Sequence, residues 1–145
     1  MRIRAAGAAD APALAALLAE LGYPDEAARV AARLEAFERD PGSVILVAED
    51  DRDVVGLASA TTIPLLHEDG RWCRVSALVV DEERRRSGAG RRLVDAVEAR
   101  ARDEGCRYLE VTSGERTERE AAHAFYEALG FEQVSRRYLK ELQAW

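Results

Sequence analysis

One segment of the chain combines arginines, close glycines and an apolar approach in a pattern that favours binding of a phosphate group. The apolar run Val75–Val80 leads into Asp81-Glu82-Glu83-Arg84-Arg85-Arg86-Ser87-Gly88-Ala89-Gly90-Arg91-Arg92. An amphipathic helix is expected to begin in this segment. Glycines let the backbone approach a ligand closely. The first turn of a helix offers unpaired N–H groups and the positive end of the helix dipole. The sequence therefore predicts a cradle for a small polyanion.

Two familiar phosphate motifs do not fit this segment. A P-loop needs Lys followed by Ser or Thr after its second glycine, whereas Arg91 follows Gly90 here. A dinucleotide fingerprint needs a further glycine at position 93, which is Leu93. A run of arginines can also be no more than a solvated turn. The two glycines in register before a helix favour the binding interpretation over that alternative.

The elements that must position this cradle follow from periodicity and from turn residues. The pattern predicts strands over residues 2–5, 43–49, 54–63, 72–80 and 107–113, with a final strand region over 131–142 that bends near Ser135. It predicts helices over residues 10–21, 25–39, 88–104 and 117–129. A hairpin turn is expected at 50–53 and a loop at 64–71. Asp10 is expected to cap the first long helix, with Pro12 in its first turn.

The order of these elements predicts the fold class. Strands 72–80 and 107–113 are joined by a helix, so they should lie parallel, whereas the earlier strands should pair antiparallel. The expectation is an α/β fold of the α+β type. It has a mixed, mostly antiparallel sheet with one parallel strand pair and helices on both faces. Residues 1–145 are expected to form one domain. Ligands bind beyond the carboxyl ends of parallel strands, where the loop 81–88 is expected.

The inward helix faces are also predicted. They are Leu14, Leu17, Leu18 and Leu21 in the first helix, Leu93, Val94, Val97 and Ala101 in the third, and Ala121, Ala122, Phe125 and Leu129 in the fourth.

Composition excludes several classes of function. The chain has 145 residues and a net charge of −6, which disfavours a nucleic-acid partner. No apolar run is long enough to cross a bilayer, so no membrane partner is expected. The two cysteines, Cys73 and Cys106, have no metal-ligand spacing and no disulfide framework. We therefore expect free thiols, no metal and a cytoplasmic location.

Two motifs together resemble a known family. The segment Arg85-Arg86-Ser87-Gly88-Ala89-Gly90, after a Val-Val-Asp strand end, resembles the pyrophosphate-binding motif of the GNAT superfamily of N-acetyltransferases. The segment Arg119–Phe131 is similar to that superfamily's A-x-x-F-Y-x-x-x-G-F helix and turn. The order of strands and the short N-terminal helix pair match as well.

The resemblance implies acetyl-CoA as cosubstrate and a set of residues that bind it. The backbone amides from Arg86 to Arg91 would hold the pyrophosphate, and the backbone of Leu78 and Val80 would pair with the pantetheine arm. The complete implied set is Leu78, Val79, Val80, Arg85, Arg86, Ser87, Gly88, Ala89, Gly90, Arg91, Arg119, Ala122 and Phe125.

The implied reaction is attack of a primary amine on the thioester carbonyl. A strand amide near Leu78 would stabilise the oxyanion, and Tyr126 would protonate the departing thiolate. Relatives often have a glutamate where this chain has Ser76, so the group that takes the proton of the amine stays open. The candidates are Glu110, the pair His67 and Glu68, and a chain of water molecules.

The expected function is transfer of an acetyl group to a primary amine of a small molecule or peptide. One alternative is a non-catalytic acyl-CoA sensor or regulatory module of the same fold, which the departure at Ser76 supports. A second is an enzyme that uses a longer acyl-CoA. The net negative charge of the chain favours a cationic acceptor, such as a polyamine, an aminoglycoside-like amine or a protein N-terminus. The resemblance also suggests a homodimer, with Tyr138–Trp145 at its interface.

Overall fold

The computed structural model describes residues 1–112, 119–134 and 137–143. The chain divides into two compact units, Met1–Thr112 and Ser113–Trp145, which are described separately. Among the described residues, the first unit contains the sheet and the helices α1 to α3, and the second contains the helix α4. A single domain over residues 1–145 stays a prediction. None of the helices in the described residues is long and apolar enough to cross a membrane.

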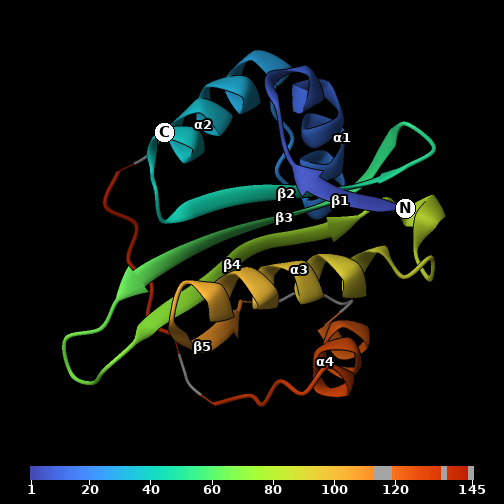
Figure 1. Cartoon of the computed structure of the whole chain (residues 1–145). Helices are drawn as coiled ribbons and strands as arrows, with labels where there is room; N and C mark the ends of the chain where they lie inside the picture. The colour runs from blue at the N-terminus through green and yellow to red at the C-terminus, as the bar shows by residue number, and fades with distance from the viewer. Residues whose placement is uncertain (113–118, 135–136, 144–145) are drawn as a thin grey trace. The chain divides into compact units, whose positions relative to one another are not determined.

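The first unit is built on a five-stranded sheet in which the strands lie in chain order (Figure 1). The strands are β1 (Arg2–Ala5), β2 (Ser43–Asp50), β3 (Asp53–Pro64), β4 (Arg71–Val80) and β5 (Cys106–Val111). Neighbours pair antiparallel from β1 to β4, and β4 pairs parallel with β5. This confirms the predicted mixed sheet with one parallel pair.

The predicted hairpin between β2 and β3 is a tight two-residue turn. Asp50 and Asp53 face each other across the strand pair, and Asp51 and Arg52 have φ angles of 51° and 74°. Two consecutive positive φ values are typical of the hairpin turn whose twist matches that of the flanking strands.

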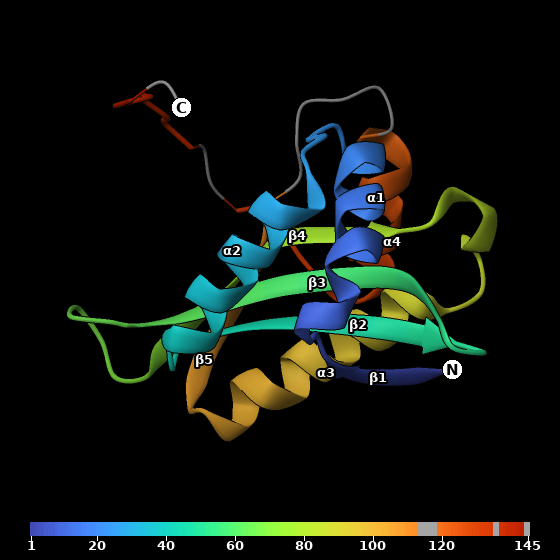
Figure 2. The same ribbon diagram turned by 90° about the horizontal axis from the view of Figure 1, so that it is seen from above.

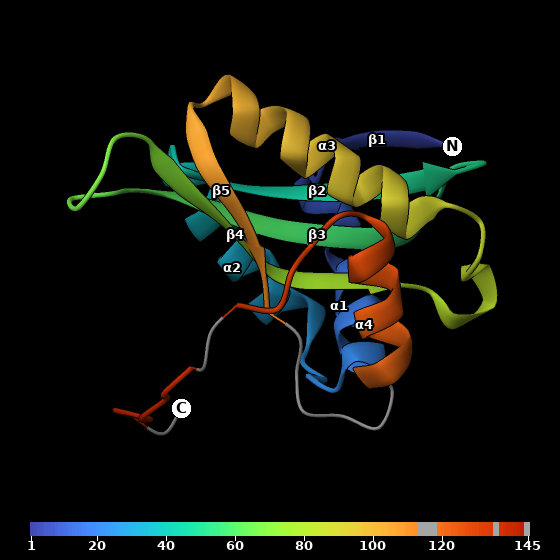
Figure 3. The same cartoon turned by 90° about the horizontal axis from the view of Figure 1, so that it is seen from below.

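Helices cover both faces of this sheet, as predicted. Helices α1 (Ala11–Leu21) and α2 (Ala27–Arg39) lie over one face, and α3 (Ala89–Asp103) lies over the other (Figures 1 and 2). Figure 3 shows α3 crossing the sheet on the face opposite α1 and α2. Because α3 connects the parallel strands β4 and β5, its N-terminus lies just beyond the carboxyl end of β4.

Two apolar clusters, one on each face, hold these layers together. Leu14 and Leu17 of α1 and Val30 of α2 pack with Val47, Leu57 and Val79 of the sheet. Leu93, Val97 and Ala101 of α3 pack with Ala48, Ala58 and Val75. Successive strand residues point to opposite faces, so neighbours such as Val47 and Ala48 serve different clusters. The predicted inward faces of α1 and α3 are confirmed.

A β-bulge interrupts this alternation at Ser76. Ser59 is opposite Ala77 and Ala60 is opposite Val75, so Ser76 is an extra residue on β4. Val75 packs on the α3 face, whereas Ala77, two residues later, packs on the face of α1 and α2. A one-residue insertion has this effect because the side-chain period of a strand is two. The bulge therefore re-aims the carboxyl half of β4.

Asp10 does not cap α1 with its side chain, contrary to expectation. Its carboxylate instead accepts hydrogen bonds from both terminal nitrogens of Arg4, at 2.8 and 2.9 Å, and from the Gly7 amide at 2.7 Å. The reason is that residues 8–10 form a short 3-10 helix, so Asp10 lies within a turn rather than ahead of one. Its side chain ties β1 to this turn.

The second unit contains α4 (Arg119–Ala128). Residues 117 and 118 of the predicted fourth helix lie outside the described residues. Of its expected inward residues, Ala122, Phe125 and Leu129 are half-buried and Ala121 is exposed. The predicted final strand is wrong for residues 131–134 and 137–142, which are neither helix nor strand; Ser135 lies outside the described residues. A strand forms only with a neighbouring edge to pair with, which a sequence pattern cannot supply.

Candidate functional site

The carboxyl half of β4 has a strand neighbour on one side only within the described residues. Pairing with β5 covers Arg71–Val75 and stops where β5 ends at Val111. Residues 77–80 continue to pair with β3 on the other side, beyond the bulge at Ser76. Alternate residues at such an edge direct their N–H and C=O groups away from the sheet. Leu78, Val79 and Val80 lie on this stretch, which can therefore accept an extended ligand as an added strand.

The loop after this edge is wound tightly into α3. The Asp81 amide donates to the Val55 carbonyl at 2.8 Å, and a 3-10 turn follows over Glu82–Arg84. Arg86 and Gly88 both have left-handed backbones, with φ angles of 72° and 88°. A left-handed non-glycine residue is strained, and such residues gather at ligand-binding sites. The strain at Arg86 therefore marks this turn as a candidate site.

The turn presents backbone amides that precede the first hydrogen bond of α3. The first hydrogen bond of α3 runs from the Arg92 amide to the Gly88 carbonyl, at 3.0 Å. The amides of Gly90 and Arg91 precede that bond and lie in the first helical turn. A Cβ placed on Gly88 would meet no atom within 4 Å, so the space beside this glycine is open. Open space beside exposed amides suits an anion such as a pyrophosphate.

The five arginines of the segment have different surroundings. Arg84 is held by the β2–β3 hairpin through Asp50 at 3.0 Å and Asp53 at 3.8 Å. Arg92 donates to the Met1 carbonyl at 3.0 Å. Arg91 makes only a long, exposed ion pair, at 4.0 Å, with Asp95.

Arg85 and Arg86 are exposed, and neither makes an ion pair with any residue that the structure describes. Their positive charges are therefore the ones available to a bound anion.

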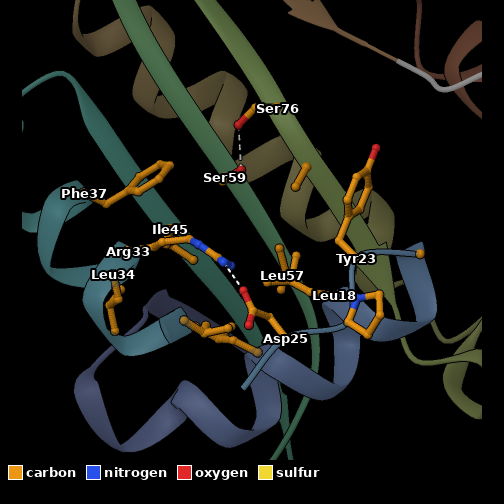
Figure 4. Close-up of a pocket in the computed structure, with 15 residues that line it drawn as sticks. Leu18, Tyr23, Asp25, Arg33, Leu34, Phe37, Ile45, Leu57, Ser59 and Ser76 are labelled. Atoms are coloured by element: carbon orange, nitrogen blue, oxygen red, sulfur yellow. Dashed lines mark hydrogen bonds and ion pairs between the residues drawn. The ribbon is translucent and has the colours of Figure 1, made fainter. Parts of the chain in front are cut away.

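A cavity of about 630 Å³ lies in the first unit between the helix pair α1–α2 and the sheet (Figure 4). Sequence reasoning did not identify it. Most of its lining side chains are apolar, and β4 contributes Ser76 and Ala77, the bulged residue and its successor. The lining residues are Leu14, Leu18, Gly22, Tyr23, Pro24, Asp25, Val30, Arg33, Leu34, Phe37, Ile45, Leu57, Ser59, Ser76 and Ala77.

The polar groups of this cavity form two separate pairs. The hydroxyl oxygens of Ser59 and Ser76 lie 2.8 Å apart, with Ser59 buried and Ser76 exposed (Figure 4). Asp25, in the connection between α1 and α2, accepts a hydrogen bond from Arg33 and lies 3.9 Å from Arg29. The Glu26 amide and then Arg33 lower the pKa of Asp25, so this carboxylate is charged at neutral pH. The sequence signal that could have identified Asp25 is its position after the helix break at Gly22–Pro24.

The side chains considered as proton acceptors do not line this cavity. Glu110 forms an ion pair with Arg74 at 2.6 Å. His67 is exposed, and Glu68 lies 3.8 Å from Arg107. His67 and Glu68 lie in the β3–β4 connection, whereas the loop 81–88 follows the opposite end of β4. A ten-residue strand separates these ends by roughly 30 Å.

In the second unit, Tyr126 is packed between aromatic neighbours. Its ring meets Phe125 and Phe131 edge-on, with centroids 5.3 and 5.8 Å away. The Phe131 amide donates to the Tyr126 carbonyl at 3.0 Å, which closes the end of α4. Burial raises the pKa of the Tyr126 phenol, which therefore stays protonated at neutral pH. Ala122 lies on the same helix, and Arg119 is its first residue.

Comparisons with known proteins agree with this arrangement. The family model of the acetyltransferase (GNAT) family matches residues 12–131. An aminoglycoside N(6')-acetyltransferase type 1 of Stenotrophomonas maltophilia is 34% identical over 140 residues, which cover 92% of this chain and 88% of that protein. N-acetyltransferase 8 of Homo sapiens is 33% identical over 106 residues, which cover 72% of this chain and 45% of that protein.

A solved protein from Agrobacterium tumefaciens str. C58 has a similar fold. It superposes with a TM-score of 0.87 at 28% identity, over 97% of this chain and 99% of the other. The family match spans most of the chain, including the loop 81–92 and α4. The chain therefore belongs to the GNAT family of N-acetyltransferases.

Proposed function

We propose that the chain uses acetyl-CoA to acetylate a primary amine of a small molecule or peptide by direct attack on the thioester. The observation that carries this proposal is the continuity of three features. The half-unpaired stretch 76–80 of β4 leads directly into the strained turn at Arg86, and this turn leads into the first amides of α3. An extended arm that ends in a pyrophosphate matches this sequence of features.

Each part of acetyl-CoA has a proposed partner. The amides of residues 86–91 and the side chains of Arg85 and Arg86 hold the pyrophosphate. The backbone of Leu78, Val79 and Val80 pairs with the pantetheine arm. The remaining proposed contacts come from Ser87, Gly88, Ala89, Gly90 and Arg91 in the loop and from Arg119, Ala122 and Phe125 in α4.

Between heavy atoms the reaction forms one bond and breaks one, and a proton is lost by the amine and gained by the sulfur. The amine nitrogen bonds to the carbonyl carbon, the carbon–sulfur bond breaks, and the thiolate takes up a proton to leave as CoA. An amide near Leu78 stabilises the oxyanion that develops on the carbonyl. Tyr126 donates the proton to the thiolate; its phenol is protonated at neutral pH, as this role requires.

We propose that water removes the proton from the amine. The support is the placement of the side-chain candidates, since Glu110 is paired with Arg74 and neither His67 nor Glu68 lines the cavity. Replacing Glu110 by Gln should then leave the rate of acetylation and its dependence on pH unchanged.

The proposed location is the cytoplasm, which fits two cysteines without a disulfide. A homodimer is also proposed. The support is that Tyr138, Leu139 and Leu142 near the C-terminus are exposed. A group of exposed apolar side chains favours an interface that covers it. Light scattering of the purified chain measures the oligomeric state.

The first experiment is isothermal titration of the purified chain with acetyl-CoA and, in parallel, with CoA. The proposal expects one site for each ligand. Absence of binding to both would show that the loop is not a CoA site. If both bind and no amine in a broad panel releases free thiol, a non-catalytic acyl-CoA sensor becomes the better description.

A further inference from the structure

The cavity between α1–α2 and the sheet has a chemistry that narrows the class of acceptor. We propose that it takes a primary monoamine with an apolar body and discriminates against polycations such as polyamines and aminoglycosides. This inference rests on the proposed function, because it identifies the amine that the acetyl group would reach. A volume of about 630 Å³ is typical of a cavity for one small molecule.

The walls of the cavity favour an apolar body. Leu14, Leu18 and Leu57 form part of one side, and Leu34 and Phe37 of α2 form part of another. Burying an apolar group against such walls removes it from water without leaving a polar group unpaired. A polar or charged body would lose its hydration there and find few partners.

The charges of the cavity do not suit a polycation. Asp25 is the lone carboxylate among the described lining residues, and Arg33 already bonds to it. Arg29 lies 3.9 Å from the same carboxylate. Among the described lining residues, the carboxylate of Asp25 and the guanidinium of Arg33 are the charged groups, and their charges offset each other. An acceptor with several ammonium groups would find no unpaired carboxylate among the described lining residues and would be repelled by the Arg33 guanidinium.

One end of the cavity can still receive an amino group. Ser59 and Ser76 share one hydrogen bond, which leaves acceptor capacity on both hydroxyl oxygens. Figure 4 shows this pair apart from the Asp25–Arg33 pair, with Ser76 on β4. Ser76 begins the stretch 76–80 where the thioester arm is proposed to lie. A single amine bound at the serine pair would therefore lie next to that arm.

This proposal differs from what the similarity to an aminoglycoside acetyltransferase would suggest. That relative is 34% identical, and its name assigns it an aminoglycoside substrate. The Asp25–Arg33 pair and the apolar walls argue that this chain takes a different acceptor.

The test measures amine binding directly, so it does not depend on turnover. The full chain is saturated with CoA and titrated calorimetrically with phenethylamine, hexylamine, spermidine, kanamycin and a short peptide with a free N-terminus. We expect the two apolar monoamines to bind at least about tenfold more tightly than the others. This is about the affinity lost when one additional charged group is buried without a partner. Thiol release from acetyl-CoA should follow the same order.

A matched pair of variants tests the role of charge. Arg33→Gln frees the Asp25 carboxylate and should improve spermidine binding about tenfold while changing hexylamine binding little. Arg39→Gln is the control, because Arg39 is also exposed on α2 and ion-paired, to Glu35, but does not line the cavity. It should change neither affinity.

Three results would overturn the inference: tighter binding of spermidine, kanamycin or the peptide than of the monoamines, no monoamine binding to the CoA-loaded chain, or equal effects of the two variants. Failure of the proposed function itself would be recognised separately, because CoA would then not bind in the first titration.

Discussion

Replacing Gly88 by Ala separates the proposed ligand-binding role of this glycine from its role in folding. Gly88 has a φ of 88°, and an added Cβ would meet nothing within 4 Å. The change therefore introduces backbone strain without a steric clash. A left-handed alanine costs about 1–2 kcal/mol, and the reduced freedom of the unfolded chain offsets about 0.4–1 kcal/mol of it. The net loss should be about 1 kcal/mol, or roughly 3 °C in melting temperature.

The effect on CoA binding should be much larger than this loss of stability implies. The new methyl group would occupy the open space in which the pyrophosphate is proposed to lie. Losing one charge-assisted hydrogen bond costs about 1.5–3 kcal/mol, which lowers affinity about 10- to 100-fold.

Gly105 provides a matched control at the other end of α3. It has a φ of 77°, and an added Cβ there would also meet nothing within 4 Å. Gly105→Ala should therefore lower the melting temperature by a similar amount and leave CoA affinity unchanged. Thermal unfolding and isothermal titration of both variants give the comparison. Equal CoA affinities in the two variants would refute the assignment of the turn at Gly88 as the pyrophosphate cradle.

Three further predictions concern the core, the ion pair at the N-terminus and the proposed acid. Leu93→Ala should lower the free energy of unfolding in urea by about 2–5 kcal/mol, because Leu93 is 0% exposed; a loss below 1 kcal/mol would contradict its place in the core. Asp10→Asn should cost about 2 kcal/mol at pH 7. Hydrogen bonding to Arg4 lowers the pKa of Asp10 below 3.8, so the wild-type advantage is complete above that pH and disappears as the pH falls through the folded-state pKa. The measurement is urea unfolding of the wild type and the variant at several pH values. A difference in stability that does not change with pH would contradict the prediction. Tyr126→Phe should lower kcat about 100-fold or more while CoA affinity is retained. The alkaline fall of the wild-type rate should lie above pH 10.0, because burial raises the pKa of the Tyr126 phenol. An unchanged kcat in the variant would remove Tyr126 from the mechanism.

The segment proposed to bind CoA could be identified from the sequence because its residues are contiguous. The strand end, the arginines and the glycines of the loop fall within residues 75–92, and the start of α3 follows directly. Hydrophobic periodicity likewise predicted the faces of α1 and α3 that pack on the sheet. These features depend on interactions between near neighbours, which a sequence pattern records.

Which arginines of the loop form ion pairs within the protein could not be predicted in the same way. Arg84 and Arg85 are adjacent and chemically identical, but Arg84 reaches Asp50 of a distant hairpin. Asp10 similarly bonds to Arg4 of β1 rather than capping α1. The partner of a long charged side chain is decided by which segments the fold brings together.

The sequence by itself determined the family, the order of strands and helices from β1 to α4, and the position of the turn proposed to bind phosphate, because each is encoded in local spacing and residue type. Only the tertiary structure decided where β4 bulges, where its pairing with β5 stops and which side chains enclose the cavity proposed for the acceptor. Ser59 and Ser76 meet only because β3 and β4 pair with a one-residue slip. Asp25 is ion-paired with Arg33 only because α2 brings Arg33 back toward the connection between α1 and α2. Such features depend on register and packing between separate segments, and these are set by the burial of the whole sheet.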